Sequence, residues 1–102
     1  MNNEELVKIL QDDFHYPSAG TSVVAKKIMQ FQPELLASFT AFIQKGELPQ
    51  ISVEDYDLER LMNEFDMNPI AGFLTLDWLM KEPEKAKLTL EQGYDTIKKN
   101  QE

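Results

Sequence analysis

The stretch NPIAGFLTLDWLMK, residues 68–81, decides the fold class of this chain. Asn68 is a good helix cap, and Pro69 is tolerated at the first helical position because its missing amide hydrogen would have no partner there. Apolar side chains then surround the helix axis on most sides, with Asp77 as the one acid. A helix that is apolar nearly all round is usually central and buried. We therefore expect residues 69–81 to form a central helix, which faces either the core alone or both the core and a partner.

Apolar residues with helical spacing continue on both sides of this segment, and no segment shows the sustained alternation of a strand. The predicted helices are residues 3–14, a helix capped at Thr21 or Ser22 whose inner face reaches Phe31, residues 33–45, a helix capped at Ser52 that ends near Phe65, and a last helix from Pro83. The predicted fold class is all-α, a compact bundle of five or six short helices around the central apolar helix at about 69–81. We expect residues 1–102 to form a single helical domain whose last few residues, 98–102, fray.

Proline and glycine mark the breaks between these helices. Residues 16–20 separate the first two helices, and Pro33 begins the third, because a proline disfavours helix at the residue before it. Gly46 ends the third helix, since glycine tolerates the left-handed conformation that closes many helices. Residues 47–52 then form a loop, in which Ile51 either inserts into the core or makes one short extended pairing.

Charge and composition narrow the class of protein. The chain has no cysteine and a net charge of −8. The lack of cysteine excludes disulfides, thiolate metal sites and cysteine nucleophiles. The first residues are acidic and polar, and no stretch approaches the roughly 18–20 apolar residues of a membrane span. We therefore expect a cytoplasmic protein that does not act at a membrane, and the negative charge makes nucleic acid an unfavourable partner.

The sequence offers no pattern for catalysis, metal binding or a cofactor. Its four glycines are far apart and form no phosphate-binding loop. His15 is the only histidine, and Asp12 can share a helix face with it, but a capping or exposed histidine at a helix end is the simpler interpretation. We expect no metal, no cofactor, no catalytic residues and no enzymatic activity.

Acidic residues concentrate between residues 47 and 66. This stretch holds seven acids and one base, Arg60, and so carries −6 of the total charge of −8. One interpretation is a solvated helix face. The other is a docking surface for a basic protein, with these candidate partner-binding residues: Glu54, Asp55, Asp57, Glu59 and Glu64.

Asp77 and Trp78 are the second candidate site. Asp77 interrupts an apolar helix, and a buried carboxylate needs a partner. Lys81 lies four residues on, which is the spacing of a helical ion pair. Asp77 therefore lies either on a solvated edge beside Lys81 or in a ligand pocket beside Trp78, whose own simplest role is in the core.

These observations favour a non-enzymatic helical protein that acts through protein–protein interaction, as a regulator or adaptor, with a protein partner or by self-association as a homodimer. One alternative is a DNA-binding regulator that uses a helix-turn-helix-like hairpin at 58–81. That alternative requires basic side chains to gather on one face, with these candidates: Lys26, Lys27, Lys81, Lys85 and Lys87. A second alternative is a small-ligand binder or enzyme with a pocket near Trp78.

Overall fold

The computed structural model describes the backbone of residues 2–101 and the side chains of residues 2–17 and 19–93. Within these residues the elements are, in chain order, α1 (Asn3–Asp12), α2 (Ser18–Met29), α3 (Pro33–Lys45), β1 (Ser52–Val53), β2 (Tyr56–Asp57), α4 (Leu58–Glu64), α5 (Pro69–Lys81) and α6 (Pro83–Gln101). The prediction of an all-α bundle is confirmed, and the described residues add only one small two-stranded sheet.

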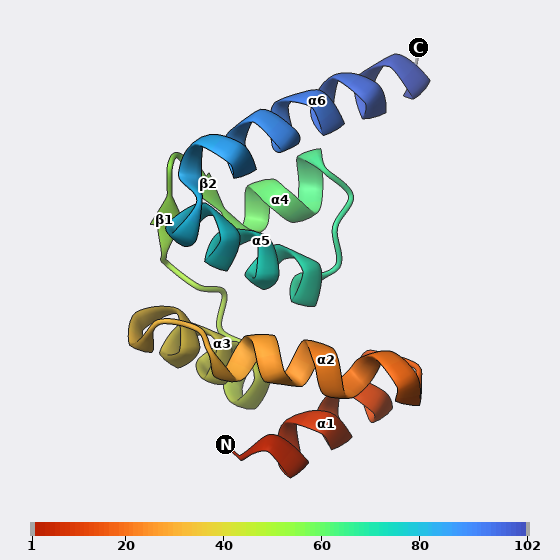
Figure 1. The fold of residues 1–102 in the computed structure, drawn as a ribbon, viewed down its shortest axis with the longest axis vertical. Coiled ribbons are helices and arrows are strands. Elements are labelled where there is room, and N and C mark those ends of the chain that lie inside the picture. Colours follow the sequence, from red (N-terminus) through yellow and green to blue (C-terminus); the bar gives the residue numbers. More distant parts are fainter. Residues whose placement is uncertain (1, 102) are drawn as a thin grey trace.

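The helices form two groups along the long axis of the molecule, which measures 41 × 26 × 23 Å. Figure 1 shows α1, α2 and α3 at one end and the strands, α4, α5 and α6 at the other, with residues 46–51 connecting them. Within these groups, α1 packs on α2, and α5 packs on α4, α6 and β1. The contact of α5 with α3 is the main one between the two groups.

The boundaries of α5 are those the sequence predicts. Asn68 caps the helix, and its side-chain oxygen accepts a hydrogen bond of 2.8 Å from the amide of Ala71. Pro69 takes the first position, and Lys81 ends the helix. Side chains from several faces of the helix are buried, namely Ile70, Phe73, Leu76, Asp77 and Leu79. Neighbouring elements of the same chain therefore explain why the helix is apolar nearly all round.

One apolar core runs through both groups of helices. Phe39 of α3 and Phe73 of α5 meet edge to face, with ring centroids 5.1 Å apart. Phe31 extends the contact on one side and Phe42 on the other, with centroid distances of 6.2 Å to Phe39 and 5.7 Å to Phe73. Phe31 thus belongs to the inner face of the bundle, as its spacing predicts, although α2 itself ends at Met29.

The first helix is two residues shorter than predicted. It ends at Asp12, and Phe14 lies beyond it, partly buried against the core. His15 has a φ of 58°, in the left-handed region, and the next amide, that of Tyr16, donates a hydrogen bond of 3.0 Å to the carbonyl of Leu10. The chain thus turns out of the helix at a histidine, where glycine or asparagine is commoner.

The start of α2 differs from the predicted cap at Thr21 or Ser22. The helix begins at Ser18, directly after Pro17, whose φ of −68° suits entry into a helix. Thr21 lies within the helix and is fully buried. Its hydroxyl donates a hydrogen bond of 2.7 Å to the carbonyl of Pro17, so it does not accept from a first-turn amide as a cap would.

A second difference is the β-hairpin at the position where Ser52 was expected to cap a helix. Ser52 instead begins β1, which pairs antiparallel with β2 so that Val53 lies opposite Tyr56. Between the strands, Glu54 and Asp55 have φ values of 51° and 69°. Two successive positive φ values characterise the tight turn that joins many hairpins, although Asn-Gly is its usual sequence.

Asp57 caps α4 in place of Ser52. Its carboxylate accepts a hydrogen bond of 2.8 Å from the amide of Arg60. Ile51 lies just before the hairpin and is partly buried against the core, so it inserts and the next two residues make the extended pairing.

The predicted ends of the remaining helices agree with the structure. Gly46 closes α3 with a φ of 70°, and α6 begins at Pro83. The expected inner positions Ala86 and Leu90 are buried, whereas the side chains of Tyr94 and Ile97 lie outside the described residues. Fraying at 98–102 stays a prediction, since the side chains of these residues and the backbone of residue 102 are outside that range too. Among the described helices, none combines the length and apolar character that crossing a bilayer demands.

Candidate binding surfaces

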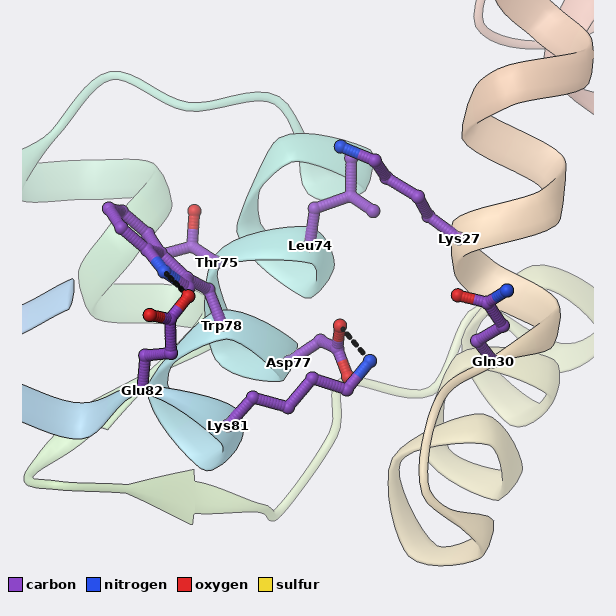
Figure 2. A pocket seen from close by; sticks show the side chains of 8 residues that line it. All are labelled: Lys27, Gln30, Leu74, Thr75, Asp77, Trp78, Lys81 and Glu82. Atoms are coloured by element: carbon purple, nitrogen blue, oxygen red, sulfur yellow. Dashed lines mark hydrogen bonds and ion pairs between the residues drawn. The ribbon is translucent and has the colours of Figure 1, made fainter. Parts of the chain in front are cut away.

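An open groove lies between α2 and α5, and we call it the α2–α5 groove. It has a volume of about 510 Å³ and is lined by Lys27, Gln30, Leu74, Thr75, Asp77, Trp78, Lys81 and Glu82. Figure 2 shows the first two side chains projecting from α2 and the residue that follows it, and the others from α5 and the residue that follows it. Both residues of the second predicted site, Asp77 and Trp78, therefore line one depression of the surface.

Helical spacing explains why each wall presents these residues. At the end of α2, Lys27 lies three residues before Gln30, the residue that closes the helix. Val23, one turn before Lys27 on the same face, is 55% exposed. On α5, Leu74 and Trp78 are four residues apart and also share a face. The sequence pattern predicts residues of the α5 wall only, because helical spacing does not show which helix will lie opposite.

Asp77 forms the predicted ion pair, but it does so from a buried position. Its Oδ2 lies 3.0 Å from Nζ of Lys81. The residue is only 8% exposed, so it does not lie on a solvated edge. Its other oxygen, Oδ1, is buried and has no hydrogen-bond partner among the described atoms. A buried acceptor without a donor lowers the stability of the folded state by about 1–3 kcal/mol, so the Asp77 carboxylate is destabilising at this position.

Trp78 contributes to both the core and the groove. It is partly buried against the core while it lines the groove. Its indole nitrogen donates a hydrogen bond of 3.3 Å to Oε1 of Glu82, and the other oxygen of Glu82 lies 4.0 Å from Nζ of Lys85. The indole N–H of Trp78 is therefore already hydrogen-bonded. The ring contributes apolar surface to the groove.

A second surface runs from α3 across the connecting loop to α4, and we call it the α3–α4 trough. Four open hollows lie in a row, and each shares lining residues with the next: Ala37 and Ala41, then residues 48–50, then Asp57 and Glu59. The α3 end has a volume of about 490 Å³ and is lined mainly by small and apolar side chains, including Leu36 and Ala37. The α4 end is lined by acids and Arg60.

The five acids predicted to bind a partner fall into two groups. Three of them already interact with this chain: Glu54 lies 3.5 Å from Lys87, Glu64 pairs with Arg60, and Asp57 caps α4. The side chains of Asp55 and Glu59 are exposed and make no hydrogen bond with a described residue, although the charge of Asp55 also acts on Arg60. Of the five, Asp57, Glu59 and Glu64 line the trough.

Arg60 neutralises part of this acidic region. Its guanidinium hydrogen-bonds to Glu64, donates to the carbonyl of Asp55 at 3.0 Å, and lies 4.4 Å from the ring centroid of Tyr56. The hydrogen bond with Glu64 is the main reason that the pKa of Arg60 is raised above its ordinary value. The base is thus held within the acidic stretch and also stabilises the hairpin turn.

The helix-turn-helix alternative receives little support from the packing. A recognition helix must present an exposed face to the major groove of DNA. The candidate helix here is α5, which packs against α3, α4 and α6, and its open face lies in a groove that α2 borders. Three of the five candidate lysines also have acidic neighbours, since Lys81, Lys85 and Lys87 lie within 4.0 Å of a carboxylate.

His15 is exposed, as the simpler interpretation of the sequence has it. Within the described residues, no group of three or more histidine and acidic side chains converges in a way that could hold a metal ion. Comparisons with protein-family models, with curated proteins and with solved structures find no match to this chain. The α2–α5 groove and the α3–α4 trough are therefore the features of the molecule that bear on its function.

Proposed function

We propose that this protein is a non-enzymatic interaction module, acting in the cytoplasm, that binds a basic segment of a partner protein along the α3–α4 trough. The observation that carries the proposal is the continuity of the four hollows, which join an apolar face of α3 to the acidic end of α4. A peptide with an apolar half and a basic half fits a surface with this division.

The apolar half of the trough is an unpaired helix face. Ala37 is exposed, Leu36 and Ala41 are partly buried, and α3 makes its main contact with α5 on its other side. Leu48, at the edge of the second hollow, is 54% exposed. When a partner covers such apolar side chains and removes them from water, the free energy of the complex is lowered.

The charged half favours a basic partner. Glu47 and Glu59 line the trough and have no ionic partner among the described residues, whereas Arg60 is engaged with Glu64. The net charge of −8 adds a long-range attraction for a basic segment and raises its rate of association. It also disfavours self-association through this surface, because two acidic troughs would repel.

The test compares three variants with the wild type in a pull-down from a nuclease-treated cell lysate at low salt. Ala37→Arg fills the apolar hollow, and Glu59→Lys reverses a charge in the acidic one. Glu91→Lys makes the same charge change at an exposed site on α6, outside the trough, and serves as the control.

The proposal expects a stoichiometric basic partner that the wild type and the Glu91→Lys variant retain and that both trough variants lose. A partner that binds all four proteins equally uses another surface, and the proposal then fails. Retention of no protein at all, together with a monomeric mass by light scattering, also contradicts it.

A further inference from the structure

The α2–α5 groove shares no lining residue with the α3–α4 trough, and nothing in the proposed function uses it. Its volume of about 510 Å³ lies within the range of pockets that hold small molecules. Such pockets combine an apolar wall with a few polar groups that fix the orientation of the ligand. Both parts are present here, on opposite sides.

The apolar part of the groove comes from α5. Leu74 and Trp78 are both partly buried against the core, which holds them in place from behind. The indole nitrogen of Trp78 already donates to Glu82, so the ring offers its apolar surface to the groove. An aromatic ring stacks favourably on such a surface.

The polar part of the groove consists mainly of hydrogen-bond donors. Lys27 reaches from α2 toward Leu74 of α5 (Figure 2), and its ammonium has no partner among the described residues. The ammonium of Lys81 has three N–H groups and uses one of them on Asp77. Gln30 adds a side-chain amide group, which makes no hydrogen bond with any described residue.

Each of the two acids at the groove interacts with a neighbouring side chain through at least one oxygen. Asp77 pairs with Lys81, and Glu82 accepts from Trp78 and lies beside Lys85. Oδ1 of Asp77 has no donor among the described residues, but it is buried from solvent and therefore out of reach of a ligand in the groove. The charged groups with unused hydrogen-bonding capacity that a ligand can reach are the ammonium groups of Lys27 and Lys81. An anionic ligand satisfies these donors best, because charge-assisted hydrogen bonds are stronger than neutral ones.

We infer that the α2–α5 groove binds a small aromatic oxyanion, with its ring against Leu74 and Trp78 and its carboxylate or phosphate oxygens at Lys27. Charge-assisted hydrogen bonds from lysine favour either oxyanion. Leu74 and Trp78 provide for the ring, and the donors on both walls provide for the charge, so a ligand needs both parts to bind well.

The test uses the indole N–H of Trp78 as a probe, because Trp78 is the only tryptophan of the chain and gives a single indole signal in a ¹⁵N-correlated NMR spectrum. Three compounds are titrated into the labelled protein. Benzoate has the ring and the charge, benzamide keeps the ring without the charge, and acetate keeps the charge without the ring. Benzoate should give a saturable shift, with an affinity about fivefold or more above those of benzamide and acetate.

Two lysine variants separate a direct contact from a general charge effect. Lys27→Gln should weaken benzoate binding by about fivefold, because it removes a charged donor from the groove. Lys26→Gln removes the same charge from the neighbouring exposed position, which does not line the groove, and should leave the affinity unchanged.

The inference is overturned by a shift that stays linear to about 20 mM benzoate, well above the millimolar range expected for a ligand of this size. It is also overturned if benzamide or acetate binds as tightly as benzoate, or if the two lysine variants behave alike. None of these outcomes bears on the α3–α4 trough, so this inference and the proposed function succeed or fail separately.

Discussion

The ring of Phe39 meets the ring of Phe73 edge to face, with an interplanar angle of 87° and both side chains fully buried. Phe39 belongs to α3 and Phe73 to α5, and this pair of helices provides the main contact between the two groups of elements. The cohesion of the molecule across its long axis therefore depends strongly on this pair of rings.

Phe39→Ala should lower the free energy of unfolding by about 3–5 kcal/mol, because it removes a buried ring and leaves a cavity between the two groups. Chemical denaturation followed by circular dichroism measures the loss. Val23→Ala at a 55% exposed position is the control and should stay within about 0.5 kcal/mol of the wild type. Equal midpoints for the two variants would show that Phe39 does not hold the groups together.

Gly72 and Gly93 form a matched pair for testing how closely α4 approaches α5. A Cβ atom added to Gly72 would lie 2.4 Å from Cδ1 of Leu58, which is itself buried, whereas one added to Gly93 meets nothing within 4 Å. Gly72→Ala should therefore destabilise the protein by about 1–2 kcal/mol, because overpacking outweighs the better helix propensity of alanine. Gly93→Ala should stabilise it by roughly 0.5–1 kcal/mol, because alanine costs less entropy in a helix.

Thermal melting of the two glycine variants decides this comparison. Gly72→Ala combined with Leu58→Ala should show a favourable coupling energy, because the smaller side chain at 58 removes the clash. A Gly72→Ala variant as stable as Gly93→Ala would mean that Leu58 moves aside without cost, and that the contact does not limit the packing of α4 on α5.

Where the sequence predicts helix ends correctly, local chemistry alone determines them. Asn68-Pro69, Lys45-Gly46 and Pro83 mark ends that the structure reproduces, because capping and proline geometry act within a few residues. The hairpin escaped prediction because Glu54 and Asp55 carry no glycine or asparagine signal for a positive φ. Contacts made from outside the turn, with Arg60 and Lys87, help to hold it, and these depend on the folded chain.

In the candidate sites, too, the residues that local sequence marks were predicted, and those that depend on how helices pack were not. Asp77 stands out in the sequence because it interrupts an apolar helix, and both Asp77 and the neighbouring Trp78 line the α2–α5 groove. No signal in the sequence places Lys27 and Gln30 opposite Trp78, because their position depends on how α2 lies against α5. The apolar end of the α3–α4 trough was missed for a similar reason, since the pattern of α3 does not show which of its apolar faces stays uncovered.

The hairpin turn provides a prediction about backbone strain. Replacing Glu54 and Asp55 together by Asn and Gly should raise the free energy of unfolding by about 1 kcal/mol, because that pair adopts positive φ values with less strain. The lost contact between Glu54 and Lys87 subtracts little, since both side chains are about 40% exposed or more. The measurement is a denaturant midpoint, with Lys87→Gln as the control for the ion pair. A double variant less stable than the wild type would show that these two acids stabilise the turn by more than the strain costs.

Replacing Asp77 and replacing Lys81 should have different effects on stability, although the two side chains form one ion pair. Lys81→Gln should destabilise the protein by about 1 kcal/mol, because it leaves a nearly buried carboxylate without its cation, although Lys81 is itself 46% exposed and water screens the pair. Asp77→Leu should be neutral or stabilising by roughly 1 kcal/mol, because it removes a buried oxygen that has no donor and replaces a charge by apolar contact. Melting temperatures of the two variants, measured side by side, test this asymmetry. If Asp77→Leu is the more damaging change, then Oδ1 has a donor in solution, such as a bound water, and the carboxylate contributes to stability beyond its pairing with Lys81.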